Sequence, residues 1–252
     1  MPPVKLNVKL LEATQNAISI IYAGYRQCYS AKFAGEIFEQ EKGNLEKQAE
    51  FIKKVVESGH ESPLEHVKFT FAIEGVSRSL THQLVRYRIA SYSQQSQRYV
   101  KETSFDYIIP PSIEKDKILK EEFVKIMREI QTSYNKMIEK FKEKGIVGEK
   151  ANQDVRFILP QAAETKIVVT MNCRELLHFF EQRCCTRAQW EIRNLANKML
   201  DICKNYLPAV FLNAGAKCKR LGYCPEGRKF TCGKYPLKED VIANTLNLRR
   251  GE

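Results

Sequence analysis

The segment 86–99 reads Arg86-Tyr87-Arg88-Ile89-Ala90-Ser91-Tyr92-Ser93-Gln94-Gln95-Ser96-Gln97-Arg98-Tyr99. It holds three arginines, three tyrosines, three serines and three glutamines, and no Asp or Glu occurs from Gly75 to Lys101. Arginine can bind phosphate oxygens through two N–H donors, and serine and glutamine add further donors, so the segment is suited to a phosphate-bearing ligand. A solvated basic surface is the alternative, but such surfaces normally mix both signs of charge.

The composition indicates a globular chain that attracts anions. The chain has 252 residues, enough for one large domain or two small ones, and 43% of them are hydrophobic. With 41 Lys and Arg against 30 Asp and Glu, the formal net charge is +11. This charge favours nucleic acids, nucleotides, or polyglutamylated or phosphorylated small molecules as ligands.

The expected location of the protein is the cytoplasm. No apolar stretch is long enough to span a bilayer, and the start Met1-Pro2-Pro3 lacks the apolar core of a signal peptide. In that compartment the eight cysteines are expected to be reduced thiols rather than a disulfide framework.

Hydrophobic periodicity predicts a chain of alternating helices and strands. Alternating apolar and polar residues predict strands at 4–10, 67–73, 105–111 and 165–171. Helical spacing of apolar residues predicts helices at 14–25, 45–58, 77–85, 115–144 and 190–202, and one that begins after Asn172.

The segment 60–66 contains two histidines and a helix-start pattern. Ser62, Pro63 and Glu65 fit the first positions of a capping box, which predicts a short helical turn. His60 and His66 are six residues apart and would not share one helical face, so they do not form the paired histidines of a metalloprotease.

A second polar stretch begins at Asn172, which fits a helix N-cap. Arg174, His178 and Gln182 follow at intervals of four and share one face of the expected helix. A single histidine on a helix is often an ordinary surface or core residue. Because His178 lies between polar residues of types that often bind ligands, a role in a site is an equally good interpretation.

The C-terminal region carries three cysteines among basic residues. Cys218, Cys224 and Cys232 follow the spacing Cys-x5-Cys-x7-Cys, which is not that of a zinc ribbon. A structural zinc ion takes four ligands, and a fourth is missing. We therefore expect no metal site, and a loose basic tail with reduced thiols.

Arg86, Arg88 and Ser96 form the pattern Arg-x-Arg-x7-Ser, with Arg98 two residues further on. This pattern resembles the signature of the flavin-dependent thymidylate synthases. One position departs from it, because Tyr87 stands where the family usually has His.

Further blocks extend the resemblance over about residues 4–212. They are Gly-His-x-Ser-x-x-Glu-His at 59–66, Arg-x-x-Leu-Pro at 156–160, Asn-x-Arg at 172–174 and Ala-Gln-Trp-Glu-Ile-Arg at 188–193. The resemblance implies an α+β fold, a single compact domain with a mixed or antiparallel sheet packed against long helices. The expected division is a synthase domain at 1–212 and a basic, Cys-containing tail at 213–252.

The resemblance also implies an activity. Such an enzyme is a methyltransferase of nucleotide biosynthesis that makes dTMP from dUMP. Methylenetetrahydrofolate gives the carbon, and NADPH gives the electrons through bound FAD. The family works as a homotetramer with sites between subunits.

Residue roles carried over from the family fall into three groups. The residues implied to contact FAD are His60, Ser62, Arg86, Tyr87, Arg88, Gln94, Asn172, Arg174 and His178. The residues implied to contact dUMP are Gln83, Arg86, Gln94, Ser96, Arg98, Arg156 and Arg183. The catalytic residue is Arg183, which the family uses to stabilise negative charge on the uracil ring, as a fixed cation can do without a covalent nucleophile. No cysteine stands in a recognisable nucleophile setting, and Ser96 has no evident base, so we interpret Ser96 as a phosphate-side donor.

Two alternatives stay open at this stage. A basic nucleic-acid-binding module would fit the net charge, but neither aromatic stacking platforms nor a helix-turn-helix pattern is visible. A diverged nucleotide-binding flavoprotein with another reaction is the second alternative, and the departure at Tyr87 is the reason to keep it.

Overall fold

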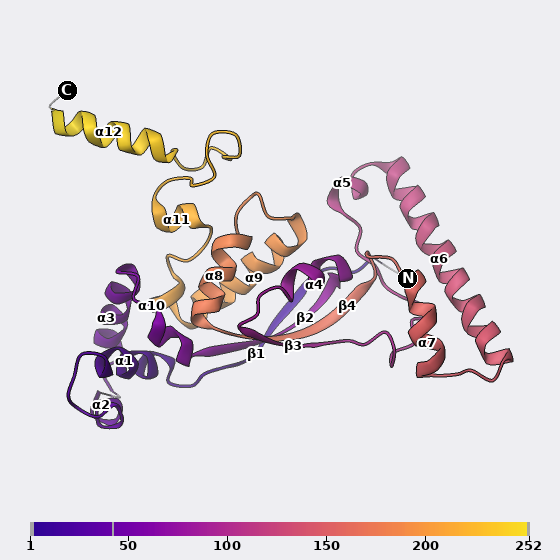
Figure 1. Ribbon diagram of the computed structural model, residues 1–252, viewed down its shortest axis with the longest axis horizontal. Helices are drawn as coiled ribbons and strands as arrows, with labels where there is room; N and C mark the ends of the chain where they lie inside the picture. The colour runs from indigo at the N-terminus through magenta and orange to yellow at the C-terminus, as the bar shows by residue number, and fades with distance from the viewer. Residues whose placement is uncertain (1–2, 42, 251–252) are drawn as a thin grey trace. The chain divides into compact units, whose positions relative to one another are not determined.

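Four strands form one antiparallel sheet in the order β1-β2-β4-β3 (Figure 1). The computed structural model describes residues 3–41 and 43–250, so positions 1, 2 and 42 of the expected domain and positions 251 and 252 of the expected tail lie outside the described residues. The strands are β1 Asn7–Ala13, β2 Lys68–Ser77, β3 Ala90–Gln94 and β4 Glu164–Asn172. The expected α+β fold, an antiparallel sheet with long helices, is confirmed.

The chain divides into two compact units. The first unit comprises Met1–Lys9, Phe71–Arg86 and Ser91–Val169, and the second comprises Leu10–Thr70, Tyr87–Ala90 and Thr170–Glu252. The helices of the first unit are α4 Arg78–Leu84, α5 Pro111–Glu114, α6 Lys117–Glu143, α7 Glu149–Val155 and the 3-10 helix η2 Arg156–Ile158. Those of the second unit are α1 Ala17–Gln27, α2 Ala34–Glu41, α3 Leu45–Glu57, the 3-10 helix η1 Ser62–His66, α8 Cys173–Arg183, α9 Trp190–Tyr206, α10 Pro208–Phe211, α11 Lys217–Leu221 and α12 Lys238–Arg250.

Helix α6 is the scaffold of the first unit, as its apolar stripe predicts. The Asp116 side chain accepts a hydrogen bond from the backbone N–H of Leu119 at 3.1 Å and caps the first turn. One apolar cluster joins Met127 to the segment 105–109, and a second joins Tyr134 to α7. Helix α6 therefore fixes the position of α7, whose polar residues contact the candidate site residue Arg98.

Helices α8 and α9 contact each other in the second unit, and α8 also contacts η1. The Asn172 side chain accepts from the backbone N–H of Glu175 at 2.8 Å, so the predicted N-cap of α8 is confirmed. Gln189 caps α9 in the same way through the N–H groups of Glu191 and Ile192. The N-termini of α8 and α9 are thus both set by local side-chain hydrogen bonds.

Several elements differ from the sequence prediction. Residues 105–111 do not form the expected strand, since Tyr107 makes only isolated bridges, to Pro3 and to Ala163. Proline lacks a backbone N–H, so Pro110 and Pro111 cannot extend such pairing. The sequence also does not predict β3, α2 or α7, which are short or lack a clear apolar period.

Within residues 3–41 and 43–250, no helix combines the length and hydrophobicity needed to cross a bilayer.

Gly75 in β2 tests how tightly the first unit is packed. Its φ is +68°, and a Cβ atom there would lie 2.0 Å from the backbone oxygen of Lys5. Gly75→Ala is expected to lower the free energy of unfolding by about 2–4 kcal/mol, from the left-handed backbone and the overlap together. Gly145→Ala is the matched control, because its φ is +74° but its Cβ would meet open space. If urea titrations show the same loss of unfolding free energy in both variants, the close packing of Gly75 against the Lys5 backbone is contradicted.

Candidate functional site

A chain of hydrogen bonds links Arg183 to His178 in the second unit. Arg183 Nε donates to the Tyr87 hydroxyl at 2.8 Å, and that hydroxyl donates to Gln182 Oε1 at 3.0 Å. The Gln182 amide nitrogen lies 3.0 Å from His178 Nε2. Because an amide NH₂ group can only donate, His178 Nε2 is the acceptor in this arrangement.

Tyr87 is the buried centre of this chain. Its side chain is 5% exposed, and its ring packs edge-on against Phe179 and His178, with centroid separations of 5.0 and 5.9 Å. Burial raises the pKa of Tyr87, and the neighbouring Arg183 cation only partly offsets the rise. The phenol therefore stays neutral and can both accept from Arg183 and donate to Gln182.

Arg183 is oriented by this contact without being neutralised. Its hydrogen bond to Tyr87 uses Nε, and its guanidinium carbon lies 5.5 Å from the Tyr87 ring centroid. In the part of the chain that the structure describes, no carboxylate forms an ion pair with it. Its two terminal NH₂ groups can therefore bind an anionic or polarised ligand side by side.

The beginning of α8 lines a cavity of about 470 Å³. Asn172, Arg174 and His178 supply its polar side, and Ile89 and Leu177 supply apolar contacts. Three of the predicted flavin-contacting residues are thus brought together.

The same cavity carries carboxylates that the sequence prediction did not anticipate. Glu61, Glu65, Glu175 and Glu181 also line it. The Glu65 carboxylate pairs with the Arg174 guanidinium. The predicted short helical turn is confirmed as η1, but the expected capping box is wrong: Glu61 rather than Ser62 is the N-cap residue, no side chain caps the turn, and Glu65 pairs with Arg174.

The remaining predicted flavin residues of the second unit lie elsewhere. His60 lines a separate hollow with Tyr29, whose hydroxyl is 3.2 Å from His60 Nδ1. The His60 carbonyl accepts from the Tyr25 hydroxyl. Ser62 and Arg88 are exposed. The structure does not bring these three residues into the cavity at α8.

The predicted dUMP residues other than Arg183 belong to the first unit. Gln94 on β3 donates to Thr81 of α4 at 3.0 Å and to Thr165 of β4 at 3.3 Å, which ties three elements together. Gln83 and Arg86 lie at the end of α4, Gln83 partly exposed and Arg86 exposed. Arg86 is also a predicted flavin residue, as is Gln94, and neither belongs to the unit that holds the α8 cavity.

Arg98 and Arg156 are both placed by α7. The Arg98 guanidinium pairs with Glu149, the first residue of α7, and the Arg98 carbonyl accepts from Asn152 at 2.9 Å. The backbone N–H of Arg98 donates to Ser96 Oγ at 3.2 Å. Arg156 follows the last residue of α7. Ser96 Oγ therefore accepts from the backbone at Arg98, and its role as a phosphate-side donor stays a prediction.

The Nε atom of the Arg98 side chain is a buried donor that lacks a hydrogen-bond partner among the described residues. Arg98 Nε is shielded from solvent and forms no hydrogen bond among the described residues. A buried donor without a partner costs about 1–3 kcal/mol, so an added acceptor oxygen would be stabilising there.

Arg78 is a further candidate, which was not among the predicted site residues. Burial lowers the pKa of Arg78, and the nearby Arg156 cation lowers it further. Arg78 and Arg156 influence each other electrostatically, and the Glu102 carboxylate acts in the opposite direction on Arg78, so an anion would be attracted to these two cations. The signal in the sequence was its place in the acid-free run, but only the fold sets Arg78 beside Arg156.

Comparison with known proteins identifies the family of this chain. Residues 9–209 match the family model Thy1, described as thymidylate synthase complementing protein. The chain belongs to the flavin-dependent thymidylate synthase family. A protein of that name from Nitratidesulfovibrio vulgaris is 54% identical over 244 residues, which cover 96% of this chain and all of the relative. Proteins of the same name from Clostridium tetani and Geobacter sulfurreducens are 49% and 44% identical, each covering 91% of this chain and 94% of the relative.

As a member of this family the chain is an enzyme, a methyltransferase with a flavin cofactor. The residues around the α8 cavity fit such a cofactor. Arg174 and His178 can face phosphate oxygens, Ile89 and Leu177 offer apolar contacts, and carboxylates such as Glu61 can accept from ribose hydroxyls. The fit to a flavin cofactor thus rests on the chemistry of the side chains that line this cavity.

The Arg98 site yields a direct test with dUMP, the nucleotide expected for the family. Arg98→Ala should weaken dUMP binding by about 1.5–3 kcal/mol, the range for a charge-assisted hydrogen bond, while flavin stays bound. Glu149→Gln should change dUMP affinity in the opposite direction. It removes the carboxylate that competes for Arg98, so dUMP binding should tighten by up to about 1 kcal/mol. Calorimetric titration measures both. Unchanged affinity in folded Arg98→Ala, or weaker binding in Glu149→Gln, would sink the assignment.

Proposed function

We propose that the enzyme makes dTMP from dUMP, with methylenetetrahydrofolate as carbon donor and NADPH as the source of electrons that pass through FAD. The observation that carries the proposal is Arg183, held by the buried Tyr87 hydroxyl with both terminal NH₂ groups unpaired among the described residues. This is the arrangement that a uracil ring needs if negative charge develops on it without a covalent enzyme bond.

The chain's own residues would divide the work as follows. Arg183 would bind the polarised ring. Arg98 and Arg156 would bind the nucleotide phosphate, with Ser96 positioning Arg98. Arg174 and His178 would hold the flavin cofactor, which supplies hydride when bound and reduced. His178, accepting from Gln182 through Nε2, would keep its second ring nitrogen available as a donor.

Three buried thiols are unsuited to act as the nucleophile of this reaction. Burial raises the pKa of Cys184 to about 12 and also raises the pKa values of Cys173 and Cys203. These three thiols stay protonated near neutrality, and the thiolate rather than the thiol is the nucleophile. Ser96 Oγ accepts from Arg98 N–H and has no recorded contact to a base among the described residues.

Further parts of the proposal rest on the family resemblance alone. They are a homotetramer with sites between subunits, a cytoplasmic location, and the division into a domain at 1–212 and a tail at 213–252. The remaining flavin contacts predicted for His60, Ser62, Arg86, Tyr87, Arg88, Gln94 and Asn172, and the dUMP contacts predicted for Gln83, Arg86 and Gln94, are part of the proposal too.

A diverged flavoprotein is the second candidate, and Tyr87 is the observation that favours it. The family usually has His at this position, whereas here a neutral phenol holds Arg183. If methyl transfer requires an imidazole at position 87, this enzyme would reduce its flavin without transferring a methyl group.

Purified enzyme distinguishes the candidates. The proposal predicts a yellow protein that releases FAD on denaturation and, with NADPH and methylenetetrahydrofolate, converts dUMP to dTMP and leaves tetrahydrofolate. NADPH oxidation that depends on dUMP but yields no dTMP would support the diverged flavoprotein. A colourless protein that binds duplex DNA with steep salt dependence would reject both readings.

The hydroxyl of Tyr87 has its own test. Tyr87→Phe keeps the buried ring but removes the partner of Arg183, so kcat/KM for dUMP should fall by about 10- to 100-fold, or about 1.5–3 kcal/mol, with flavin content unchanged. Tyr92→Phe is the matched control, since it also deletes a hydroxyl that bonds a carbonyl, that of Leu84 at 2.8 Å, outside the Arg183 chain. Tyr87→His should stay within about tenfold of wild type if positioning is all that matters. Equal losses in Tyr87→Phe and Tyr92→Phe would show that the hydroxyl has no special role.

A further inference from the structure

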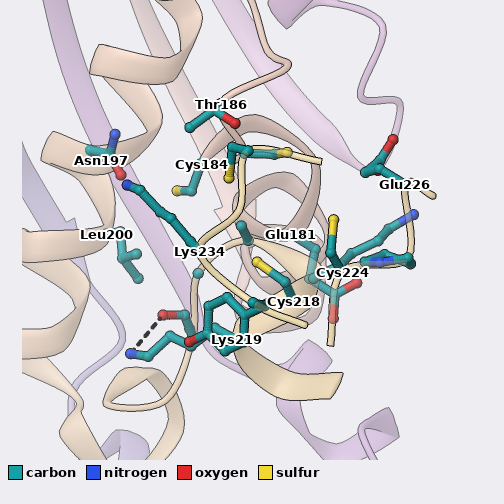
Figure 2. A pocket seen from close by; sticks show the side chains of 18 of the residues that line it. Glu181, Cys184, Thr186, Asn197, Leu200, Cys218, Lys219, Cys224, Glu226 and Lys234 are labelled. Carbon is teal, nitrogen blue, oxygen red and sulfur yellow. Dashed lines mark hydrogen bonds between the residues drawn. The ribbon is translucent and has the colours of Figure 1, made fainter. Parts of the chain in front are cut away.

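Five of the eight cysteines line one cavity of about 260 Å³ in the second unit (Figure 2). They come from two separate parts of the chain. The connection between α8 and α9 supplies Cys184 and Cys185, and the C-terminal segment supplies Cys218, Cys224 and Cys232. Neither the family activity nor the proposed mechanism uses them.

Polar contacts hold the C-terminal segment against this connection. The Arg187 guanidinium pairs with Glu226 and lies over the Phe230 ring, 4.3 Å from its centroid. Arg220 Nε donates to the Glu181 carboxylate of α8 at 2.6 Å. The thiols are therefore brought together by specific contacts on both sides of the cavity, and the expected loose tail is docked at this point.

The five thiols differ in access and in reactivity. Cys232 is exposed, and hydrogen bonds from the Thr186 hydroxyl and the backbone N–H of Lys234 hold its pKa below the ordinary thiol value. Cys218 is half-buried; burial raises its pKa, and so do the neighbouring thiols of Cys185, Cys224 and Cys232. Cys224 is buried. Cys232 is thus the thiol that is most readily deprotonated and reached, and Cys218 is the thiol surrounded by the others.

We propose that this cavity is a site of thiol–disulfide exchange in which Cys232 reacts first with a low-molecular-weight disulfide and Cys218 resolves the product. The Cys232 thiolate attacks one sulfur of the small disulfide, a mixed disulfide forms, and one small thiolate leaves and takes up a proton. Cys218 then loses its proton and attacks the Cys232 sulfur, which releases the second small thiol. The two protein thiols are oxidised by two electrons to one Cys218–Cys232 disulfide, and the small disulfide is reduced to two thiols.

A bound metal ion is the rival occupant of a thiol-lined cavity. Soft ions such as Zn²⁺ need three or four ligands at fixed geometry. Across residues 3–41 and 43–250, no group of three or more His, Cys, Asp or Glu side chains is placed to hold a metal ion. The arrangement therefore favours exchange between pairs of thiols.

The test uses the full-length, reduced protein and 2-hydroxyethyl disulfide under anaerobic conditions. Mass spectrometry of the intact chain should show the loss of one pair of hydrogens. Because trypsin cuts after Lys217, Lys219, Lys229 and Lys234, it separates Cys218 from Cys232, and the two short peptides should be recovered joined.

Variants identify the order of events. Cys218→Ser should stop at the mixed disulfide on Cys232. Cys232→Ser should slow the first step by about tenfold or more, because the most thiolate-rich sulfur is gone. Cys28→Ser is the matched control: Cys28 is exposed but does not line the cavity, so the joined peptides should form as in wild type.

Three results would overturn the proposal. The first is a wild-type chain in which Cys218 and Cys232 are recovered unjoined after complete reaction. The second is a mixed disulfide that forms on Cys28 before Cys232. The third is stoichiometric zinc in the purified protein that protects the five thiols until a chelator removes it. None of these depends on dTMP synthesis, so the proposed function can stand or fall separately.

Discussion

The buried hydroxyl of Tyr87 is the contact on which the candidate site depends. It accepts from Arg183 and donates to Gln182, whose amide meets His178, so one phenol sets the orientation of three side chains on the last two turns of α8. A polar atom this deeply buried is costly unless its bonds are satisfied. These hydrogen bonds therefore stabilise one orientation of Arg183, whose terminal NH₂ groups are unpaired among the described residues.

Charge compensation differs between the two groups of candidate arginines. Arg98 and Arg174 each pair with a carboxylate, Glu149 and Glu65, whereas Arg183 is held by a neutral phenol. A phosphate proposed to bind at Arg98 would compete with a carboxylate, whereas no carboxylate among the described residues pairs with Arg183. Binding strength is thus tuned at the paired arginines, while full positive charge is kept for the place where charge is proposed to develop.

Much of the fold follows from the sequence, because strong apolar periods set α6, α8, α9, β2 and β4. The polar β3 carries no such period, and the segment 105–111 has one but pairs only at Tyr107. For the candidate site, local motifs predicted Arg98, Arg174 and His178. They could not show that Glu65 would turn to Arg174, that Arg78 would lie near Arg156, or that Tyr87 would meet Arg183. These contacts join residues up to 109 positions apart, and only tertiary packing decides them.

The most direct test of the account is the Nε–H proton of Arg183, observed by side-chain ¹⁵N NMR and assigned with Arg183→Lys. The account predicts a resonance protected from solvent exchange, because Nε–H donates to a buried oxygen, and predicts that Tyr87→Phe removes this protection. Arg88, which is exposed, is the internal reference for fast exchange. An Arg183 Nε–H that exchanges as fast as that of Arg88 in the wild type would contradict the account.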